Sequence, residues 1–559
     1  MQLPTKLTLQ EILRNSAKQF GDKLALSFVS NTPVSYNKMA EMARKIGFYL
    51  HEKGIKKQDK IAILSENMPN WGVSYFSISA SGNVTVPILV DFSAKEVNNI
   101  LEHSDSKMLF ISKKLTAKHG DALQFDGDII YIDDFSSAKE DEDGIEEFAI
   151  KNAGTFAKYA APEVEENDLA SIIYTSGTTG RNKGVMLSNL NIVYDAVQIL
   201  TVQNVTPEDS LVSVLPLAHS YECTLGFILP LMCGATIYYL EKPPTASHLL
   251  PALQQIRPTL ILTVPLIIEK IFKMQIKPKL TKGFVMKLLY KVGFIRKKLF
   301  RIAGKQLMEK FGGRLIFFGI GGAPLNPEVE KFLLASGIPY AIGYGMTETS
   351  PITAAGGVGK THLGGIGIII DGAEMYIDNP HPKTGEGEMV VRGKMVMQGY
   401  YKDPEITREV LSEDGWLRTG DLGVIKNGIL YIKGRSKNMI LGASGENIYP
   451  EEIEAVINSI DAVSESLVCK ANNKLIAKVV FEKETFEAAI EEYWQQDMTH
   501  YIEFNASHSW EEKTKSYLQN LKQEINEHFG KFSQIADIEV RFEPFEKTAT
   551  QKIKRYLYC

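Results

Sequence analysis

The segment SIIYTSGTTGRNKGVMLSNLN, residues 171–191, holds the densest group of side chains that could bind phosphate. A β-rich run ends at Tyr174, and a helix is expected to begin near Ser188. Between them, glycines let backbone amides turn toward an anion, hydroxyls add donors, and Lys183 adds a positive charge. Asn182 stands where the GxxxxGK[ST] pattern requires Gly, which disfavours a Walker-type kinase or ATPase. The segment therefore predicts a strand, loop and helix that cradle phosphate. Its loop residues are Thr175, Ser176, Gly177, Thr178, Thr179, Gly180 and Gly184.

The same segment resembles the pyrophosphate-contacting signature of the acyl-adenylate-forming enzymes. This superfamily includes acyl-CoA synthetases, adenylation domains of peptide synthetases and beetle luciferases. The resemblance covers nearly the whole chain, and two further segments, LPLAHSYE and TATQKIKR, are most similar to long-chain fatty-acid CoA ligases. The segments that follow the superfamily order are LPLAHSYE (215–222), GIGGAPL (319–325), GYGMTETS (343–350), GWLRTGDLG (415–423), GRSKNMILGASGENIYPEEIE (434–454) and KTATQKIKR (547–555).

The resemblance implies a two-step ligase that uses ATP, Mg²⁺ and coenzyme A. A fatty-acid carboxylate attacks the α-phosphorus of ATP and pyrophosphate leaves; coenzyme A then takes the acyl group and AMP is released. Like charges meet in the first step, so cations and hydrogen-bond donors must offset their repulsion. The residues that the resemblance assigns to ATP or AMP are Thr175, Ser176, Gly177, Thr178, Thr179, Gly180, Lys183, Gly322, Ala323, Tyr344, Gly345, Thr347, Asp421, Arg435 and Lys552.

The segment GYGMTETS supplies three of the roles that the resemblance implies. Tyr344 offers a ring to adenine, Thr347 offers a hydroxyl to the α-phosphate, and Glu348 offers a carboxylate to Mg²⁺. Magnesium prefers one or two carboxylates together with phosphate oxygens. Thr175 and Thr179 are further candidates for the metal site.

Two charged residues are expected near the ribose. Asp421, in TGDLG, can accept hydrogen bonds from both ribose hydroxyls at once, and the resemblance places Arg435 beside the same ribose and phosphate. The alternative for both residues is an ion pair that only supports the fold.

Lys552 is the lysine that, by resemblance, reaches across a domain junction to the carboxylate oxygen and the α-phosphate. It would obstruct coenzyme A in the second step, so the small domain is expected to rotate, with Lys437 at the hinge position. A lysine near a chain end is ordinarily solvated and has no catalytic role. The catalytic role of Lys552 is therefore inferred from the surrounding TATQKIKR motif. Lys552, Glu348, Thr347 and His219 are the catalytic candidates.

The acyl pocket is expected around glycines and one histidine. GIGGAPL has little side-chain bulk, so Gly321, Gly322 and Ala323 could form the wall between adenine and the acyl group. Gly343 and His219 complete the acyl-binding candidates. The alternatives are that GIGGAPL forms a simple tight turn and that His219 is a buried core histidine. The depth of a tunnel would depend on residues 215–226, 262–267 and 318–350.

The elements that must position these residues follow a regular order. From about residue 24 to 370, short β-rich runs alternate with helical ones, which predicts two helix-covered, mostly parallel sheets. Gly-spaced runs after Gly364 predict a small antiparallel, barrel-like sheet. A small, mobile α+β lid is expected at the C-terminal end. The sequence thus predicts an α/β fold with domains at 1–435 and 436–559.

Composition limits the remaining classes. The 559 residues carry 62 Lys or Arg and 67 Asp or Glu, a net charge of −5, which argues against a nucleic-acid binder. Four scattered cysteines favour a reducing cytosol over a disulfide framework. The first 20 residues predict a helix after Thr8 rather than an export signal, so a cytoplasmic protein is expected. The apolar residues 225–240 are too short for a membrane span and predict a helix that runs into a strand.

Residues 270–310 are strongly basic. They contain 13 Lys or Arg and one acid, Glu309, a local net charge of +12, so the remaining chain carries −17. Apolar residues alternate with these cations, which fits either a solvated helical face or peripheral contact with the inner face of an anionic membrane. The oligomeric state stays open, with a homodimer as one alternative.

Proteins with other functions would contain some of the same sequence motifs. A ligase that loads a carrier protein would have the same ATP motifs, and so would a medium-chain or aryl-acid CoA ligase. A lipid-binding protein without turnover is a non-enzymatic alternative, which the joint presence of Lys552, Glu348, Asp421 and Arg435 disfavours.

Overall fold

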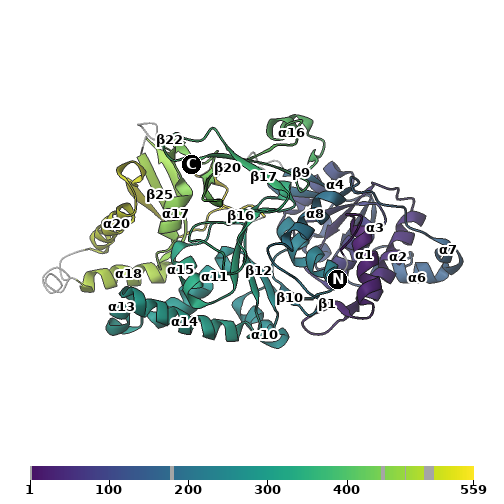
Figure 1. Cartoon of the computed structure of the whole chain (residues 1–559), viewed down its shortest axis with the longest axis horizontal. Coiled ribbons are helices and arrows are strands. Elements are labelled where there is room, and N and C mark those ends of the chain that lie inside the picture. Colours follow the sequence, from purple (N-terminus) through teal and green to yellow (C-terminus); the bar gives the residue numbers. More distant parts are fainter. Residues whose placement is uncertain (1–2, 177–181, 442–446, 473, 497–508, 550) are drawn as a thin grey trace.

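The large N-terminal part of the chain contains two mostly parallel sheets with helices packed against them (Figure 1). The computed structural model describes residues 3–176, 182–441, 447–472, 474–496, 509–549 and 551–559. One sheet has the strand order β19-β9-β8-β4-β3-β5-β6-β7, and the other has the order β16-β15-β14-β13-β12-β10-β11-β1-β2. The α/β architecture expected from the alternating runs is therefore confirmed.

The strands of these sheets are short and mostly buried, as expected when helices cover both faces of a parallel sheet. The eight-stranded sheet contains β3 (Lys60–Leu64), β4 (Val84–Ile88), β5 (Met108–Ile111), β6 (Asp128–Tyr131), β7 (Ser136–Ser137), β8 (Leu169–Ser176), β9 (Asn182–Ser188) and β19 (Gly399–Tyr400). The nine-stranded sheet contains β1 (Leu24–Phe28), β2 (Val34–Ser35), β10 (Ser210–Ser213), β11 (Thr236–Tyr239), β12 (Leu260–Thr263), β13 (Phe317–Ile320), β14 (Tyr340–Gly345), β15 (Ile352–Ala355) and β16 (Ile368–Ile369).

The helices begin at residues that can cap them. The helix expected after Thr8 is α1, and the Thr8 side chain accepts a hydrogen bond from the backbone N–H of Glu11. The helix expected near residue 188 is α8, which Ser188 and Asn191 cap reciprocally. The N-terminal helices are α1 (Leu9–Phe20), α2 (Tyr36–Glu52), α3 (Pro69–Ala80), α4 (Ala94–Ser104), α5 (Lys113–His119), α6 (Ile145–Lys151), α7 (Ala153–Lys158), α8 (Asn189–Ile199), α9 (Leu229–Met232), α10 (Ala246–Ile256), α11 (Pro265–Ile271), α12 (Lys277–Leu280), α13 (Gly283–Lys291), α14 (Gly293–Lys310), α15 (Pro327–Ser336) and α16 (Pro404–Val410).

The apolar stretch 225–240 lies inside the N-terminal part. A π-helical segment, Glu222–Ile228, leads into α9 and then into β11, so the expected helix followed by a strand is confirmed. Among the residues that the structure describes, none of the helices combines the length and the apolar character needed to cross a bilayer.

The segment expected to form a strand, a loop and a helix instead forms a β-hairpin before the helix. β8 continues to Ser176, and β9 returns antiparallel to it, with Thr175 opposite Lys183. The strand assignment of residues 182–188 corrects the sequence-based expectation that they form a loop. Its physical reason is that β8 needs hydrogen-bond partners on this side, and β9 supplies them while burying Val185 and Leu187.

A four-stranded antiparallel sheet follows the two large sheets, as the Gly-spaced runs predict. In the order β17-β18-β20-β21, the last two strands pair so that Asp421 lies opposite Arg435. The strands are β17 (Ala373–Asp378), β18 (Gly387–Gly393), β20 (Leu417–Lys426) and β21 (Ile429–Arg435).

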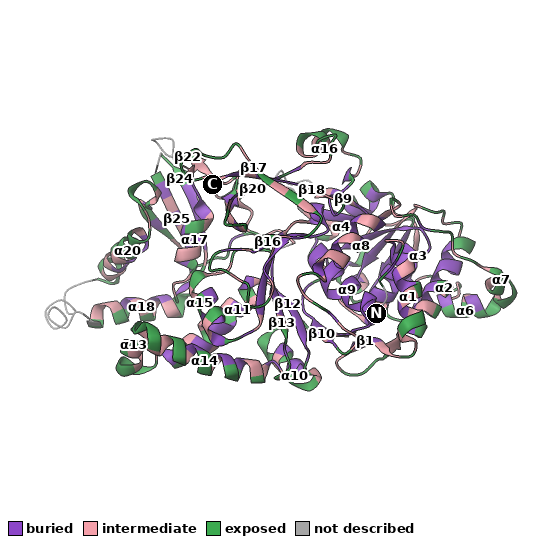
Figure 2. Cartoon of the chain, viewed as in Figure 1, coloured by how far each residue is buried: buried purple, intermediate pink, exposed green. Residues whose placement is uncertain are grey.

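The C-terminal part has its own sheet and its own apolar core (Figure 2). β25 pairs antiparallel with β24 and parallel with β26. The core contains buried residues from Ile448 to Ile538, and the boundary after residue 435 stays a prediction. The elements are β22 (Ile440–Leu441), β23 (Asn447–Ile448), α17 (Pro450–Asn458), β24 (Val463–Ala471), β25 (Lys474–Phe481), α18 (Lys483–Gln496), α20 (Trp510–Glu527) and β26 (Asp537–Arg541).

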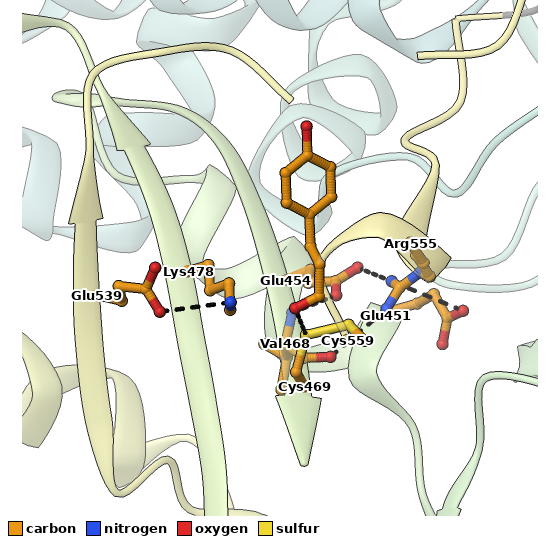
Figure 3. The surroundings of a disulfide bond; sticks show 9 residues. Glu451, Glu454, Val468, Cys469, Lys478, Glu539, Arg555 and Cys559 are labelled. Atoms are coloured by element: carbon orange, nitrogen blue, oxygen red, sulfur yellow. Dashed lines mark hydrogen bonds and ion pairs between the residues drawn. A yellow bond between two sulfur atoms is a disulfide. The ribbon is translucent and has the colours of Figure 1, made fainter. Parts of the chain in front are cut away.

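A disulfide joins Cys469, on β24, to Cys559 at the end of the chain (Figure 3). The four scattered cysteines were interpreted as evidence against a disulfide framework, and this single disulfide was not predicted; Cys223 and Cys233 are free and buried. Spacing along the sequence could not reveal the pair, because the 90-residue separation closes only when the C-terminal tail folds back on β24. Arg555 fixes the same tail through an ion pair with Glu454.

Candidate active site

The paired strands β20 and β21 hold a charged cluster at the start of the site. The Asp421 carboxylate is buried, and Tyr344 donates its hydroxyl to it at 2.7 Å. Arg435 Nε lies 3.1 Å from the other Asp421 oxygen, while the Arg435 side chain is half exposed. The structure thus brings together three residues that the sequence analysis assigned to the nucleotide. The ion pair that was the alternative explanation for Asp421 and Arg435 is also present.

Glu348 lies on a tight turn, Thr347–Thr349, directly after β14. Its carboxylate accepts a hydrogen bond from the Tyr400 hydroxyl at 2.8 Å, and the Thr347 hydroxyl lies 3.5 Å from that of Ser220. Gly345 makes the turn possible, because a Cβ there would lie 1.6 Å from the backbone oxygen of Pro351. Gly345 is therefore required by the backbone, whatever it contacts in a ligand.

The tail of the chain brings Lys552 to this cluster. Its ammonium interacts electrostatically with Arg435, Asp421 and Glu348. Although the side chain is exposed in the cleft, the protein around it disfavours the charged form by desolvation, and Arg435 adds repulsion; together these lower the pKa of Lys552. A partly desolvated ammonium group such as that of Lys552 interacts strongly with an anionic ligand.

The loop that carries Lys552 is anchored on both sides. Ala549 packs against the cluster of strands β3, β4, β5 and β8 in the N-terminal part. The backbone N–H of Thr548 donates to the Lys552 carbonyl at 2.8 Å, and three residues later Arg555 pairs with Glu454. The C-terminal part thus completes a site that lies mainly on the N-terminal part.

His219 is half-buried and stays neutral near pH 7. Burial, with a smaller effect from Lys552, lowers its pKa to about 4. Its Nδ1 accepts a hydrogen bond from the backbone N–H of Tyr221 at 3.2 Å, so Nε2 carries the proton. His219 can therefore donate a hydrogen bond, but it is a poor base at neutral pH.

The phosphate hairpin is described only in part. Thr175 is half-buried on β8, and Lys183 Nζ lies 4.8 Å from the centre of the Tyr400 ring. Four predicted phosphate contacts, Gly177, Thr178, Thr179 and Gly180, lie outside the described residues, as does the side chain of Ser176.

An apolar cavity lies between the end of α8 and the strands of the nine-stranded sheet. Its volume is about 50 Å³. Gly343 lines it, and Gly321 borders it, since a Cβ at Gly321 would lie 3.2 Å from the Tyr221 ring. Gly322, which adopts φ +87°, and Ala323 are exposed beside it. Besides Gly343, the three stretches named from the sequence contribute Tyr221, Leu225, Leu262, Gly319, Ile320, Ala341 and Ile342 to its lining. The lining residues missed lie in 199–205 and 352–356 and at Leu211, Leu229, Leu260 and Phe317.

The donor set fits magnesium only together with a substrate. Glu348 is a single acceptor carboxylate, and among the described residues no cluster of three or more His, Cys, Asp or Glu side chains could hold a metal alone. Magnesium commonly takes one or two protein carboxylates and completes its shell with phosphate oxygens and water. Glu348 is therefore suited to a Mg²⁺ ion that arrives with a nucleotide.

Two residues of the site escaped the sequence analysis. Tyr400 holds Glu348, yet its sequence context, a Gly followed by two Tyr residues, gives no sign of this. Glu222 is fully buried and receives a hydrogen bond from Ser213 at 2.6 Å, while its second oxygen has no protein partner. Burial raises the pKa of Glu222 to about 8, so it is protonated at neutral pH. The sequence did offer one sign that Glu222 is buried, which is its position beside a strongly apolar run.

Comparison with known proteins now identifies the family. The sequence profile described as AMP-binding enzyme matches residues 13–401 of the chain. The chain belongs to the AMP-binding enzyme family. This result confirms the resemblance found in the sequence motifs and makes the protein an adenylate-forming ligase.

The relatives of this AMP-binding enzyme differ in what their names say they act on. The peroxisomal long chain acyl-CoA synthetase 7 of Arabidopsis thaliana is 30% identical over 81% of this chain and 69% of its own. A chloroplastic long-chain-fatty-acid–[acyl-carrier-protein] ligase of the same plant is 27% identical over 84% and 75%. A solved O-succinylbenzoate coenzyme A synthetase from Bacillus subtilis, in complex with ATP and magnesium ion, has a TM-score of 0.71 at 21% identity, covering 98% of both chains. The last likeness shows the fold alone.

Proposed function

We propose that this AMP-binding enzyme activates a fatty acid, with long chains preferred, and transfers the acyl group to coenzyme A. The observation that carries the proposal is the meeting of Lys552, from the C-terminal tail, with Glu348, Asp421 and Arg435 beside an apolar cavity. Charged groups at the mouth of an apolar space suit a substrate with an anionic head and a hydrocarbon tail.

The nucleotide would occupy the charged cluster. Asp421 would accept from the ribose hydroxyls through the remaining lone pairs of its two oxygens, one of which contacts Tyr344 and the other Arg435. Lys183, on the phosphate hairpin, would attract the β- and γ-phosphates as they leave, and Arg435 the α-phosphate. Glu348 would bind Mg²⁺, which neutralises phosphate charge when bound.

In the first step, an oxygen of the fatty-acid carboxylate forms a bond to the α-phosphorus while the bond to pyrophosphate breaks. Two anions approach each other, and Lys552 lies where its ammonium can contact both. His219 donates from Nε2 to the carboxylate or to the acyl carbonyl, because its Nδ1 is already an acceptor. The expected contribution of such a positioned donor is about 10²- to 10³-fold in rate.

In the second step, the sulfur of coenzyme A bonds to the acyl carbon, AMP leaves and the thiol proton passes to solvent. Lys552 would obstruct the thiol if it stayed beside Glu348 and Asp421, so we expect the C-terminal part to rotate for this step. Lys437 lies two residues beyond the end of β21, where the chain leaves the four-stranded sheet, and we propose it as the hinge.

The acyl chain would extend into the cavity beyond Gly343. Its lining is almost entirely aliphatic or aromatic, which supports an apolar acyl group, and the cavity would widen to admit a long chain. The match of the long chain acyl-CoA synthetase of Arabidopsis thaliana to most of the chain supports the long-chain preference. A carrier-protein acceptor is the second candidate, since the chloroplastic acyl-carrier-protein ligase covers a similar share.

A panel of carboxylates tests the proposal. Acetate, octanoate, palmitate and benzoate would be incubated with Mg·ATP, and pyrophosphate and AMP would be measured with coenzyme A, with an acyl carrier protein, or with neither. We expect pyrophosphate release with palmitate and AMP release stimulated by coenzyme A. Acyl transfer to the carrier protein alone would reject coenzyme A, and activity with benzoate alone would reject the fatty acid.

The cellular location is also a proposal. A cytoplasmic enzyme would meet its ATP and coenzyme A there, while peroxisomal and chloroplastic relatives illustrate other compartments. The Cys469–Cys559 disulfide is more typical of oxidising surroundings, so its redox state in cells would help decide the compartment.

A further inference from the structure

The helices α13 and α14 expose apolar side chains that surface helices usually bury. Phe284 is 83% exposed and Phe294 is 70% exposed, and Val285 and Leu288 lie beside Phe284 on α13. Figure 1 shows these two helices along one edge of the molecule, far from α6 and α7 at the opposite end. Figure 2 shows α13 largely in the colour of exposed residues. We call the exposed side chains of α13 and α14 the basic edge.

The exposed and buried faces of α14 are distinct. Phe300, Gly304 and Leu307, spaced by four and three residues, are buried against the protein. The opposite face carries Phe294 and Ile302, which alternate with cations. Within the described residues this face is largely uncovered, and a second surface that buried its phenylalanine and isoleucine would gain free energy. The cations of this face are Lys298, Arg301 and Lys305.

Much of the local positive charge has no counterion in the described part of the chain. Lys277 pairs with Glu328 and Asp461, and Lys287 pairs with Glu492, so these two are satisfied by the protein. The exposed cations of the basic edge for which the described residues provide no ion pair are Lys291, Lys297, Lys298, Arg301 and Lys305.

A groove beside α14 adds an apolar recess. It has a volume of about 240 Å³ and lies between α14 and the segment that leads into α12. Ile276, Leu280 and Ile302 are among its lining residues, and two lysines, Lys279 and Lys310, also line it. A recess that combines aliphatic walls with cations suits an amphiphile with an anionic head.

We propose that the basic edge docks on a bilayer that contains anionic phospholipids. Cations would meet the lipid phosphates while Phe284 and Phe294 enter the interface between headgroups and acyl chains. A protein partner fits less well, since lysine is depleted at protein interfaces. A nucleic acid fits less well, since Val285, Leu288 and Ile302 offer no hydrogen bonds to bases. This inference does not rest on the proposed function, because it uses none of the residues of the active site.

Vesicle co-sedimentation of the full chain tests the docking surface. Phosphatidylcholine vesicles with and without phosphatidylglycerol would be compared at low and high salt. We expect binding only to the anionic vesicles, weakened by salt because exposed charges are screened. Equal binding to neutral and anionic vesicles would overturn the role of the cations.

Double variants of the basic edge, with a control pair elsewhere, test whether this edge is the surface that binds the vesicles. Lys297→Gln with Lys298→Gln should weaken partitioning roughly 25-fold, at about fivefold per cation, and Phe284→Ser with Phe294→Ser at least about tenfold. The control pair, Ile150→Ser with Lys158→Gln, changes an exposed apolar residue and an exposed lysine on α6 and α7 and should leave binding unchanged. An equal loss in the control pair would refute the assignment. So would a concentration-dependent dimer that the phenylalanine variant abolishes, because a second copy would then cover the edge.

Discussion

The disulfide between Cys469 and Cys559 should carry much of the stability of the C-terminal part. Replacing Cys559 by Ser opens a loop whose ends are 90 residues apart in the sequence. In the chain-entropy description, closing a loop of that length lowers the free energy of the folded state relative to the unfolded state by about 4.6 kcal/mol. Whole domains are commonly stable by about 5–15 kcal/mol, so the loss would leave a small margin.

The functional effect follows from the position of Lys552. Lys552 lies seven positions before Cys559, and the other anchors of this tail include the ion pair of Arg555 with Glu454. A C-terminal part that unfolds locally would withdraw Lys552 from Glu348 and Asp421. We therefore expect Cys559→Ser to lower the denaturant midpoint of the C-terminal transition and to reduce pyrophosphate release.

The assay compares urea unfolding and adenylation for the oxidised chain and for Cys559→Ser, each with and without a dithiol reductant. Reductant should convert the wild-type curve into that of the variant and should leave the variant unchanged, since Cys223 and Cys233 are already free. Coinciding curves for the oxidised chain and the variant, or an equal effect of reductant on both, would refute the reasoning.

The other predictions concern single residues. Lys552→Ala should lower pyrophosphate release about 10²- to 10³-fold but retain thiolysis of a supplied acyl-adenylate by coenzyme A, and equal loss in both half-reactions would contradict its assigned place. Asp421→Asn should raise the KM for ATP roughly tenfold, whereas Asp378→Asn, which weakens the Arg418 ion pair elsewhere in the same sheet, should leave it unchanged. Burial raises the pKa of Glu222 from 4.5 to about 8, so Glu222 binds its proton more tightly in the folded chain than in the unfolded chain. As the pH rises between these two values, the unfolded chain loses this proton first, and the free energy of unfolding falls. The expected fall is on the order of 3 kcal/mol up to pH 7. Glu222→Gln should flatten that part of the stability profile measured by thermal unfolding, and parallel profiles for the two proteins would show that Glu222 is not the titrating group.

The architecture could be predicted from the sequence because local patterns of apolar and polar residues indicate which segments are buried. Apolar runs such as 61–64 and 108–111 became buried parallel strands, and the Gly-spaced runs after residue 364 became an antiparallel sheet. Capping residues such as Thr8 and Ser188 fixed helix starts, since they satisfy backbone donors within one turn.

Contacts between distant segments were harder to predict. β9 was expected to be a loop, because its glycine and polar residues hide a pairing with β8 that tertiary packing stabilises. The disulfide and the Tyr400–Glu348 hydrogen bond join residues 90 and 52 positions apart, and neither residue pair has a local signature. The charged cluster of Asp421, Arg435 and Lys552 was anticipated only through the motifs that the chain shares with its superfamily.

Tyr400 links three segments whose movements would otherwise be independent. Through its backbone it pairs with Val185 on the phosphate hairpin, its ring lies under Lys183, and its hydroxyl holds Glu348. A shift of the hairpin when a triphosphate arrives would therefore be transmitted to the carboxylate through one rigid aromatic side chain. A single phenol ring thus lies between Lys183, the lysine proposed to attract the outer phosphates, and Glu348, the acid proposed to bind magnesium, and holds the two at a fixed spacing.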